Sequence, residues 1–317
     1  MTEWTMTCYD GRTYTLPAPL AWRLDYGLGD PCDGFWVKTL WTAGQEDILA
    51  DGVRMTVTRG GETVFTGVVD ECLCQWSDQG CTAEITGRGL QGLLLDNQAE
   101  AADYGLATLE EILRQYVTPF GISLAVPVTL PGAAGFSVAS GSSCWKVLYQ
   151  FARYYGGACP RFDRQGRLHL EPWGDENPVI LDETAPVTRT ALRETRYGVL
   201  SQVTVKDLSG WTEQTEVNQN FLDRGGCARR VICLPRKVGY QARRYQARFQ
   251  LDRSAAGLRQ IEVTLAIPFA AWPGDLVQLT RAGWSRNGLY RVQACSVEMN
   301  ERGIQTILVL GAPDAVL

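Results

Sequence analysis

The 317-residue sequence has little of what membrane proteins, metalloproteins and most hydrolases require. It has no run of about 18 apolar residues, so no membrane-spanning helix is predicted. Its first residues do not combine a charged stretch with an apolar one, so we expect no signal peptide and folding in a cytoplasm. The only histidine is His169, and the ten cysteines include no Cys-x-x-Cys pair. Because tetrahedral zinc needs four clustered ligands, we expect no metal, no cofactor, and reduced thiols packed as small apolar residues.

Catalytic patterns are also scarce. Any triad would have to use His169, which lies in a predicted strand beside a turn and is interpreted as a packed or edge-strand residue. The G-x-S-x-G elbow is absent, and the glycines of 87–92 are in the wrong order for a dinucleotide-binding loop. Neighbouring acidic pairs occur by chance among 35 acidic residues. We therefore expect no enzyme, with a glycoside or peptidoglycan hydrolase as a minor alternative.

What the sequence does contain is a succession of strand patterns. Thirty-three glycines and ten tryptophans suit a β-rich protein with many turns. Apolar and polar residues alternate over 53–58, and Gly60-Gly61 then turns the chain into a second arm over 62–69. Residues 1–98 are therefore predicted to form a first domain of strands and turns.

The pattern changes between 99 and 184, which we predict to be a mixed α/β middle domain. A helix over 109–117 should begin with a capping box of Thr108 and Glu111 and end at Pro119. A second helix should begin at Ser142 or Ser143 and run to Tyr155. Residues 161–170 are typical of a hairpin with a turn at 165–166.

Residues 185–317 again alternate as strands with turns between them, which favours a barrel or a sandwich there. The predicted fold class is thus mainly β with a smaller α+β unit: two β-rich domains and a mixed middle domain.

Charge is distributed unevenly between these domains. Residues 1–98 carry 6 basic and 14 acidic residues, 99–184 carry 6 and 10, and 185–317 carry 18 and 11. Oppositely charged ends suit docking against copies of the same chain or a shaped partner.

The basic excess is concentrated over about 224–251, which holds eight cations and no acid. Its glycines and Pro235 favour a projecting hairpin or arm that meets an acidic neighbour, whereas nucleic-acid binding is the alternative. The predicted partner-binding residues are Arg224, Arg229, Arg230, Arg236, Lys237, Arg243, Arg244 and Arg248.

Several motifs in order resemble the baseplate hub family of contractile phage tails. They are Phe65–Asp70, Glu84–Leu90 with Leu95-Asp96, Ser143–Leu148, Arg161–Leu168, Pro273–Val277, Gly288–Val292 and Gly303–Thr306. The family includes late-control gene D proteins and the hubs of Mu-like and Gram-positive phages and tailocins.

The resemblance implies that 1–98 and 185–317 are two antiparallel β-barrel-like domains. It further implies a structural subunit of a homotrimer, whose two barrels per chain form a pseudo-sixfold ring between tail tube and central spike. Expected partners are the tube protein, the spike, and further a LysM-type tube-initiation protein and the tape measure, with DNA only passing through the channel. The expected location is the virion baseplate or a tailocin particle, assembled in the bacterial host cytoplasm. A fused hydrolase, which some members carry, is not expected here.

The alternative from another class is a carbohydrate- or receptor-binding β-module. It would require tryptophans near turns to be exposed on one face, namely Trp76, Trp173, Trp211 and Trp284.

Overall fold

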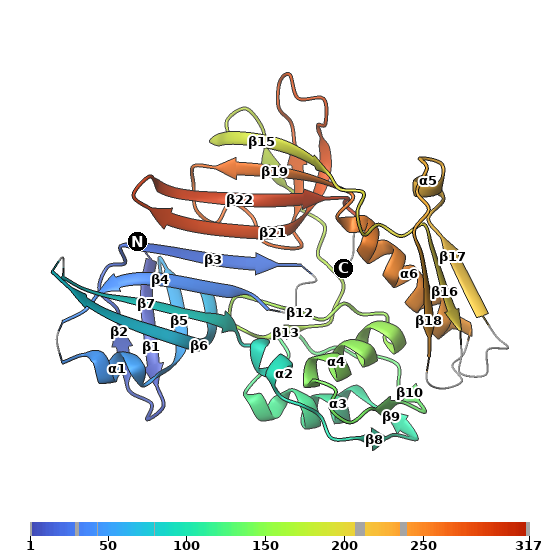
Figure 1. Cartoon of the computed structure of the whole chain (residues 1–317), viewed down its shortest axis with the longest axis horizontal. Coiled ribbons are helices and arrows are strands. Elements are labelled where there is room, and N and C mark those ends of the chain that lie inside the picture. The colour runs from blue at the N-terminus through green and yellow to red at the C-terminus, as the bar shows by residue number, and fades with distance from the viewer. Residues whose placement is uncertain are drawn as a thin grey trace. The chain divides into compact units, whose positions relative to one another are not determined.

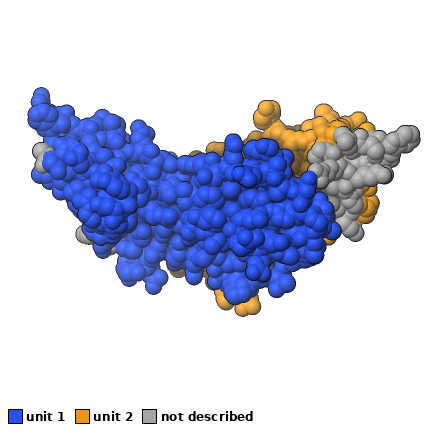
Figure 2. All heavy atoms as spheres, turned by 90° about the horizontal axis from the view of Figure 1, so that it is seen from below, with its two compact units in different colours: residues 1–172, 265–272, 294–307 blue, residues 173–264, 273–293, 308–317 orange. Residues whose placement is uncertain are grey.

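The computed structural model describes residues 2–28, 32–42, 44–78, 80–206, 213–234 and 240–314. The chain divides into two compact units, which Figure 2 distinguishes by colour. The first contains 1–172, 265–272 and 294–307, and the second contains the remainder. Both units are dominated by strands with smaller helical parts, which confirms the mainly β fold class. Within the described residues, no helix has the length and apolarity needed to cross a membrane.

The first unit is built on an antiparallel sheet from the N-terminal third of the chain (Figure 1). Its strands are β1 (Thr2–Cys8), β2 (Thr13–Thr15), β3 (Ala21–Gly27), β4 (Gly34–Leu40), β5 (Gly52–Arg59), β6 (Glu62–Ser77) and β7 (Gly80–Gly89), with helix α1 (Glu46–Ala50) before β5. The strand order is β3-β4-β7-β6-β5-β1-β2. The predicted hairpin of β5 and β6 is confirmed. On the other side of β3, residues 294–299 of strand β21 (Gly288–Asn300) complete this sheet.

Alternation places large aromatic side chains on the inner face of the sheet. Trp4, Trp22, Phe35 and Phe65 are almost fully buried, and their ring centroids lie 5.4 to 6.2 Å apart in tilted and edge contacts. Such contacts stabilise beyond the area they bury. These four aromatic side chains thus form part of the core of the first unit.

An arginine clamp joins β6, β7 and the short helix α2 (Gly92–Asp96). The Arg88 guanidinium donates to both carboxylate oxygens of Asp70 at 2.7 and 2.8 Å and to both of Asp96 at 3.0 and 2.8 Å. These bonds hold the pKa of Asp96 below its usual range. The strands also approach closely here, since a Cβ on Gly87 would lie 2.0 Å from the Val68 carbonyl oxygen. The two motifs over 65–70 and 84–90 therefore encode one structural junction.

The rest of the first unit is a mixed α/β part with its own core. It contains β8 (Ala102–Asp103), β9 (Leu106–Ala107), α3 (Leu109–Tyr116), the 3-10 turn η1 (Thr118–Phe120), β10 (Ala133–Ala134), β11 (Ser137–Val138), α4 (Cys144–Tyr149), the π-helical turn η2 (Gln150–Tyr155), β12 (Arg161–Phe162) and β13 (Leu168–His169). The capping box of Thr108 and Glu111 is confirmed, as is a helix start at Ser143, whose Oγ accepts from the Lys146 backbone N–H. Buried residues such as Ile112, Leu148 and Phe151 form the core.

His169 lies on the confirmed β12–β13 hairpin between two carboxylates. Its Nδ1 is 2.5 Å from Glu171 Oε1 and its Nε2 is 3.0 Å from Asp163 Oδ2. Burial raises the pKa of Asp163, but hydrogen bonds from the Arg167 backbone and from His169 outweigh it and hold the pKa low. Burial also raises the pKa of Glu171. Hydrogen bonds from His169 and from the backbone N–H of Glu171, with the charge of Arg161, outweigh burial and hold the pKa below its usual value. These contacts stay within one hairpin and its adjoining residues.

The cysteines are free thiols, and the expectation that they pack as small apolar residues is right for only some of them. Cys8, Cys144, Cys159 and Cys295 are buried. Four others are half-buried, whereas Cys227 and Cys233 are exposed.

The second unit contains further strands around β21. They are β14 (Val179–Leu181), β15 (Val187–Glu194), β19 (Arg259–Leu265), β20 (Leu276–Leu279) and β22 (Gly303–Gly311). Strands β21 and β22 each have residues in both units. Strand β14 pairs parallel with β20, which pairs antiparallel with the first residues of β21. Inside this unit the Arg291 side chain donates to Asp175, to the Gly274 carbonyl and to the Pro313 carbonyl.

A small α/β lobe of the second unit corrects the expectation of strands alone after 185. Strands β16 (Gln202–Lys206), β17 (Glu213–Val217) and β18 (Arg229–Cys233) form a sheet in the order β17-β16-β18. Helices α5 (Gln219–Leu222) and α6 (Tyr240–Ala256) belong to the same lobe (Figure 1). Ala247 and Leu251 of α6, one turn apart, pack on Val203 and Val205 of β16. The 17 residues of α6 are rich in Ala, Gln and Arg, which are strong helix formers.

Candidate partner-binding surface

The described part of the predicted basic segment lies in this lobe, but it is a strand and a helix rather than a hairpin. The structure places Arg224 in the turn after α5, Arg229 and Arg230 in β18, and Arg243, Arg244 and Arg248 in α6, while Arg236 and Lys237 lie outside the described residues. The expected hairpin is therefore wrong. Residues 240–256 form a helix instead, because packing an apolar stripe on β16 stabilises the helix more than an unpacked arm could be stabilised.

Most of the described cations make contacts inside the lobe. Arg244 and Arg248 each place Nε near Glu216 of β17, at 3.5 and 3.1 Å. Burial raises the pKa of Glu216, but Gln214 and the two arginines outweigh it and hold the pKa low. Arg230 donates to Gln250 of α6 at 2.8 Å, and Arg243 is buried. Arg230, Arg244 and Arg248 thus connect α6 to the sheet.

The remaining cations lie outward. Arg224 and Arg229 are exposed, and Val231, two residues along β18 and so on the same face, is 60% exposed. Strand β18 pairs with β16 on one side and has no second partner strand among the described residues. An unpaired edge with outward arginines is a surface able to accept another chain.

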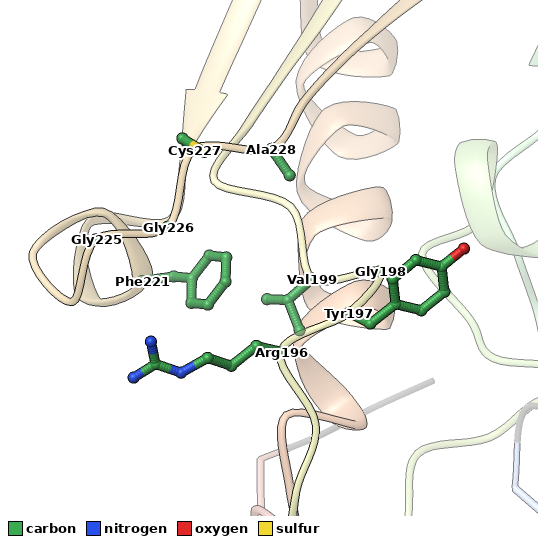
Figure 3. A pocket seen from close by; sticks show the side chains of 9 residues that line it. All are labelled: Arg196, Tyr197, Gly198, Val199, Phe221, Gly225, Gly226, Cys227 and Ala228. Carbon is green, nitrogen blue, oxygen red and sulfur yellow. The ribbon is translucent and has the colours of Figure 1, made fainter.

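Beside this edge lies a pocket of about 390 Å³ (Figure 3). It is lined by Arg196, Tyr197, Gly198, Val199, Phe221, Gly225, Gly226, Cys227 and Ala228. Phe221 and Val199 face it with apolar side chains, Arg196 extends along one side, and Tyr197 points away. The pocket is therefore an apolar hollow with a cation at its margin.

Local sequence explains how the pocket forms. Asn218 caps α5 by accepting from the Phe221 backbone N–H at 3.2 Å, which fixes the start of the turn. The chain then reverses, and the Gly226 backbone N–H donates to the Phe221 carbonyl at 2.8 Å. A Cβ on Gly226 would lie 2.3 Å from the Phe221 ring, so only glycine leaves room for that ring. Sequence reasoning assigned this Gly-Gly pair to a hairpin and missed the pocket; the Asn cap before it was the available signal.

Among the described residues, only one of the tryptophans that the alternative interpretation requires is exposed. Trp76 is exposed, but Trp173 and Trp284 are only partly exposed, and Trp211 lies outside the described residues. The Trp173 ring stands 5.9 Å from the Arg291 guanidinium of its own unit. Nor do the described residues contain a group of three or more His, Cys, Asp or Glu able to hold a metal.

Comparison with known proteins gave matches among solved structures. No family model and no curated sequence matches the chain. The tail protein from Neisseria meningitidis MC58 covers 99% of both chains with a TM-score of 0.77 at 17% identity. The 43 kDa tail protein of prophage MuSo2 from Shewanella oneidensis covers 99% of both chains with a TM-score of 0.77 at 18% identity.

The chain has a phage tail-protein fold. A further match is the Escherichia coli c3393 protein, a type VI secretion component described as structurally similar to the T4 tail proteins gp27 and gp5. It covers 94% of this chain and 74% of its own, with a TM-score of 0.56 at 11% identity. The phage tail-protein fold thus extends over nearly the whole chain, including the lobe that carries the pocket.

Proposed function

We propose that the protein is a structural baseplate hub subunit, which forms a trimeric, pseudo-sixfold ring between the tail tube and the central spike. The observation that carries this proposal is the match to two phage tail proteins over 99% of each chain. The type VI secretion match extends the proposal to a phage tail, a tailocin or a related contractile injection system. We assign no catalytic role to His169, because both its ring nitrogens contact carboxylates of its own hairpin.

Charge supports association of identical chains. Residues 1–98 have an excess of eight acids, and residues 185–317 an excess of seven cations. In a ring, the basic end of each subunit faces the acidic end of the next, so the attraction repeats at each interface. We retain 1–98, 99–184 and 185–317 as the three functional domains of this proposal, the first and third being barrel-like.

Further partners follow from the same proposal. The tube protein and the spike would occupy opposite faces of the ring, with a LysM-type tube-initiation protein and the tape measure as additional partners. DNA would touch the ring only in passing through its channel. The particle would be a virion or tailocin assembled in the host cytoplasm.

Contacts within the lobe reduce the number of the eight basic residues that are free to bind a partner. Arg224 and Arg229 are the described members that lie fully outward. Arg244 and Arg248 are bound to Glu216, although the Arg248 side chain remains about half exposed. Exposed pairs contribute only about 0.2 to 1 kcal/mol each, so several must act together.

The decisive experiment is light scattering coupled to size exclusion, with electron micrographs of the purified protein alone and mixed with its tube and spike proteins. A threefold ring with a pore is expected. A strict monomer at high concentration under both conditions would refute the hub proposal.

A charge-reversal variant tests the basic surface. Arg224→Glu with Arg229→Glu should weaken assembly and leave folding intact, since both side chains are exposed. Arg302→Glu, an exposed cation of the first unit, is the control. Assembly that survives while DNA passage is lost would show that these arginines meet nucleic acid instead of protein.

A further inference from the structure

The end of the β6–β7 hairpin extends beyond the strands that flank it. Strand β5 pairs with β6 only as far as Val68, and β4 pairs with β7 only as far as Thr82. Beyond these points Trp76 lies opposite Cys81, and no third strand pairs with this end among the described residues. The hairpin end, residues 76–78 and 80–81, is thus a short two-stranded projection, in which the Cys81 carbonyl accepts one backbone bond from Trp41.

The projection carries a tryptophan and one acidic residue. The Trp76 side chain is 85% exposed, in contrast to the buried tryptophans of the same sheet. Asp78, two residues after it, is also exposed. Tryptophan buries about 150 to 250 Å² when covered and is enriched among residues that dominate binding energy. An exposed Trp on a projecting hairpin therefore has the character of an interface anchor.

The pocket beside β18 is complementary to this projection in shape and charge. Its apolar wall of Phe221 and Val199 suits an aromatic ring, and its 390 Å³ falls at the lower end of the range of about 300 to 1,000 Å³ for ligand pockets. Arg196 at its margin and Arg224 in the adjoining turn are opposite in charge to Asp78 of the hairpin end.

We propose that Trp76 of one copy inserts into the Phe221 pocket of the next copy. The inference rests on the proposed ring, because a closed ring of three requires a heterologous interface: each subunit must present two different, mutually complementary patches. The hairpin end supplies the knob and the pocket the hole. The occupant of the pocket is thus a second copy of this chain.

A mutational test uses two exposed aromatics of the first unit. Trp76→Ala should weaken self-association by about 30-fold or more, the effect of an interface hot spot. Tyr9→Ala removes an aromatic ring that is 72% exposed elsewhere on the unit and should leave association unchanged. If Trp76→Ala associates as strongly as wild type, the inference is overturned. It is also overturned if Trp76→Ala assembles normally but loses binding to a glycan.

Cross-linking tests the pairing itself. Ser77→Cys places a thiol next to the intact Trp76, and Cys227 already lines the pocket. Mild oxidation, with tube and spike present if assembly needs them, should yield covalent dimers and trimers. The double variant with Cys227→Ser should lose these products but keep any formed by Cys74, Cys81 or Cys233.

The outcomes separate the two proposals. A threefold ring of the Ser77→Cys variant that forms no disulfide to Cys227 overturns the knob-and-pocket inference and leaves the hub function standing. A cross-link within single chains also overturns the inference, because the pocket would then hold its own hairpin. Absence of any ring overturns the hub function.

Discussion

Replacement of Arg291 tests how far one buried guanidinium holds the second unit together. Its Nη1 and Nη2 donate to the two carboxylate oxygens of Asp175 at 2.9 and 2.8 Å. Nη1 also donates to the Gly274 carbonyl at 2.8 Å, and Nε donates to the Pro313 carbonyl at 2.7 Å. Since the side chain is only 4% exposed, Arg291 joins three distant chain segments away from solvent.

The expected loss of stability follows from the hydrogen bonds that each partner loses in Arg291→Met. This substitution keeps most of the side-chain length but removes every donor. The Asp175 side chain is 45% exposed and can be hydrated again, so loss of the ion pair itself costs little. The carbonyls of Gly274 and Pro313 lose a charged donor, at about 1 to 3 kcal/mol for each group left unsatisfied. We expect unfolding of the second unit to become easier by about 3 to 5 kcal/mol. Asp175→Asn should cost only about 1 kcal/mol.

The measurement is calorimetric unfolding, in which about 1 kcal/mol corresponds to about 4 °C for a unit of this size. Arg286→Met, at an exposed arginine of the same unit, is the control and should stay within about 0.5 kcal/mol of wild type. If Arg291→Met costs no more than Asp175→Asn, the reasoning from the two carbonyls is refuted.

Three further predictions concern the mixed part of the first unit. Thr108→Ala should lower the unfolding free energy of this part by about 1 kcal/mol in urea titration, whereas Thr108→Ser should keep the stability of wild type, because the capping box needs the hydroxyl. Equal stability of the two variants would contradict the role of the cap. The folded protein lowers the pKa values of Asp163 and Glu171, so the stability that these carboxylates contribute is complete above their ordinary pKa and is lost as pH falls through the lower folded values. Asp163→Asn should therefore flatten the acid limb of a curve of unfolding free energy against pH. An unchanged acid limb would count against this reasoning. His169→Gln should leave assembly intact by light scattering, and loss of the ring would show that this hairpin has a role in assembly.

Much of the fold could be predicted because its signals are local. Alternation of apolar residues identified the β5–β6 hairpin, and the pairing of Thr108 with Glu111 identified the start of α3. Both patterns depend on neighbours within a few residues, where strand and helix periods differ clearly.

Helix α6 could not be predicted in the same way. Its stripe of Ala247 and Leu251 is narrow, and surrounding arginines drew attention to charge. The helix is stabilised by packing on β16, and its arginines bind Glu216, which lies 28 and 32 residues earlier in the sequence. Such partners are fixed by tertiary packing, which overrides a weak local pattern. The pocket escaped prediction for the same reason, since its walls come from 196–199 and 221–228.

The motifs that carried the family resemblance acquire a physical meaning from the two arginine clamps. Arg88 lies in the motif over 84–90 and binds Asp70 of the motif over 65–70 together with Asp96. Arg291 lies in the motif over 288–292 and binds the Gly274 carbonyl of the motif over 273–277. A guanidinium can serve several fixed acceptors at once, and lysine cannot reproduce that planar fork. Sequence signatures far apart in the chain thus coincide with the points where each unit joins its separate segments. At 17 and 18% identity most side chains differ from those of the matched tail proteins, and we expect these two junctions to be among the contacts that are retained.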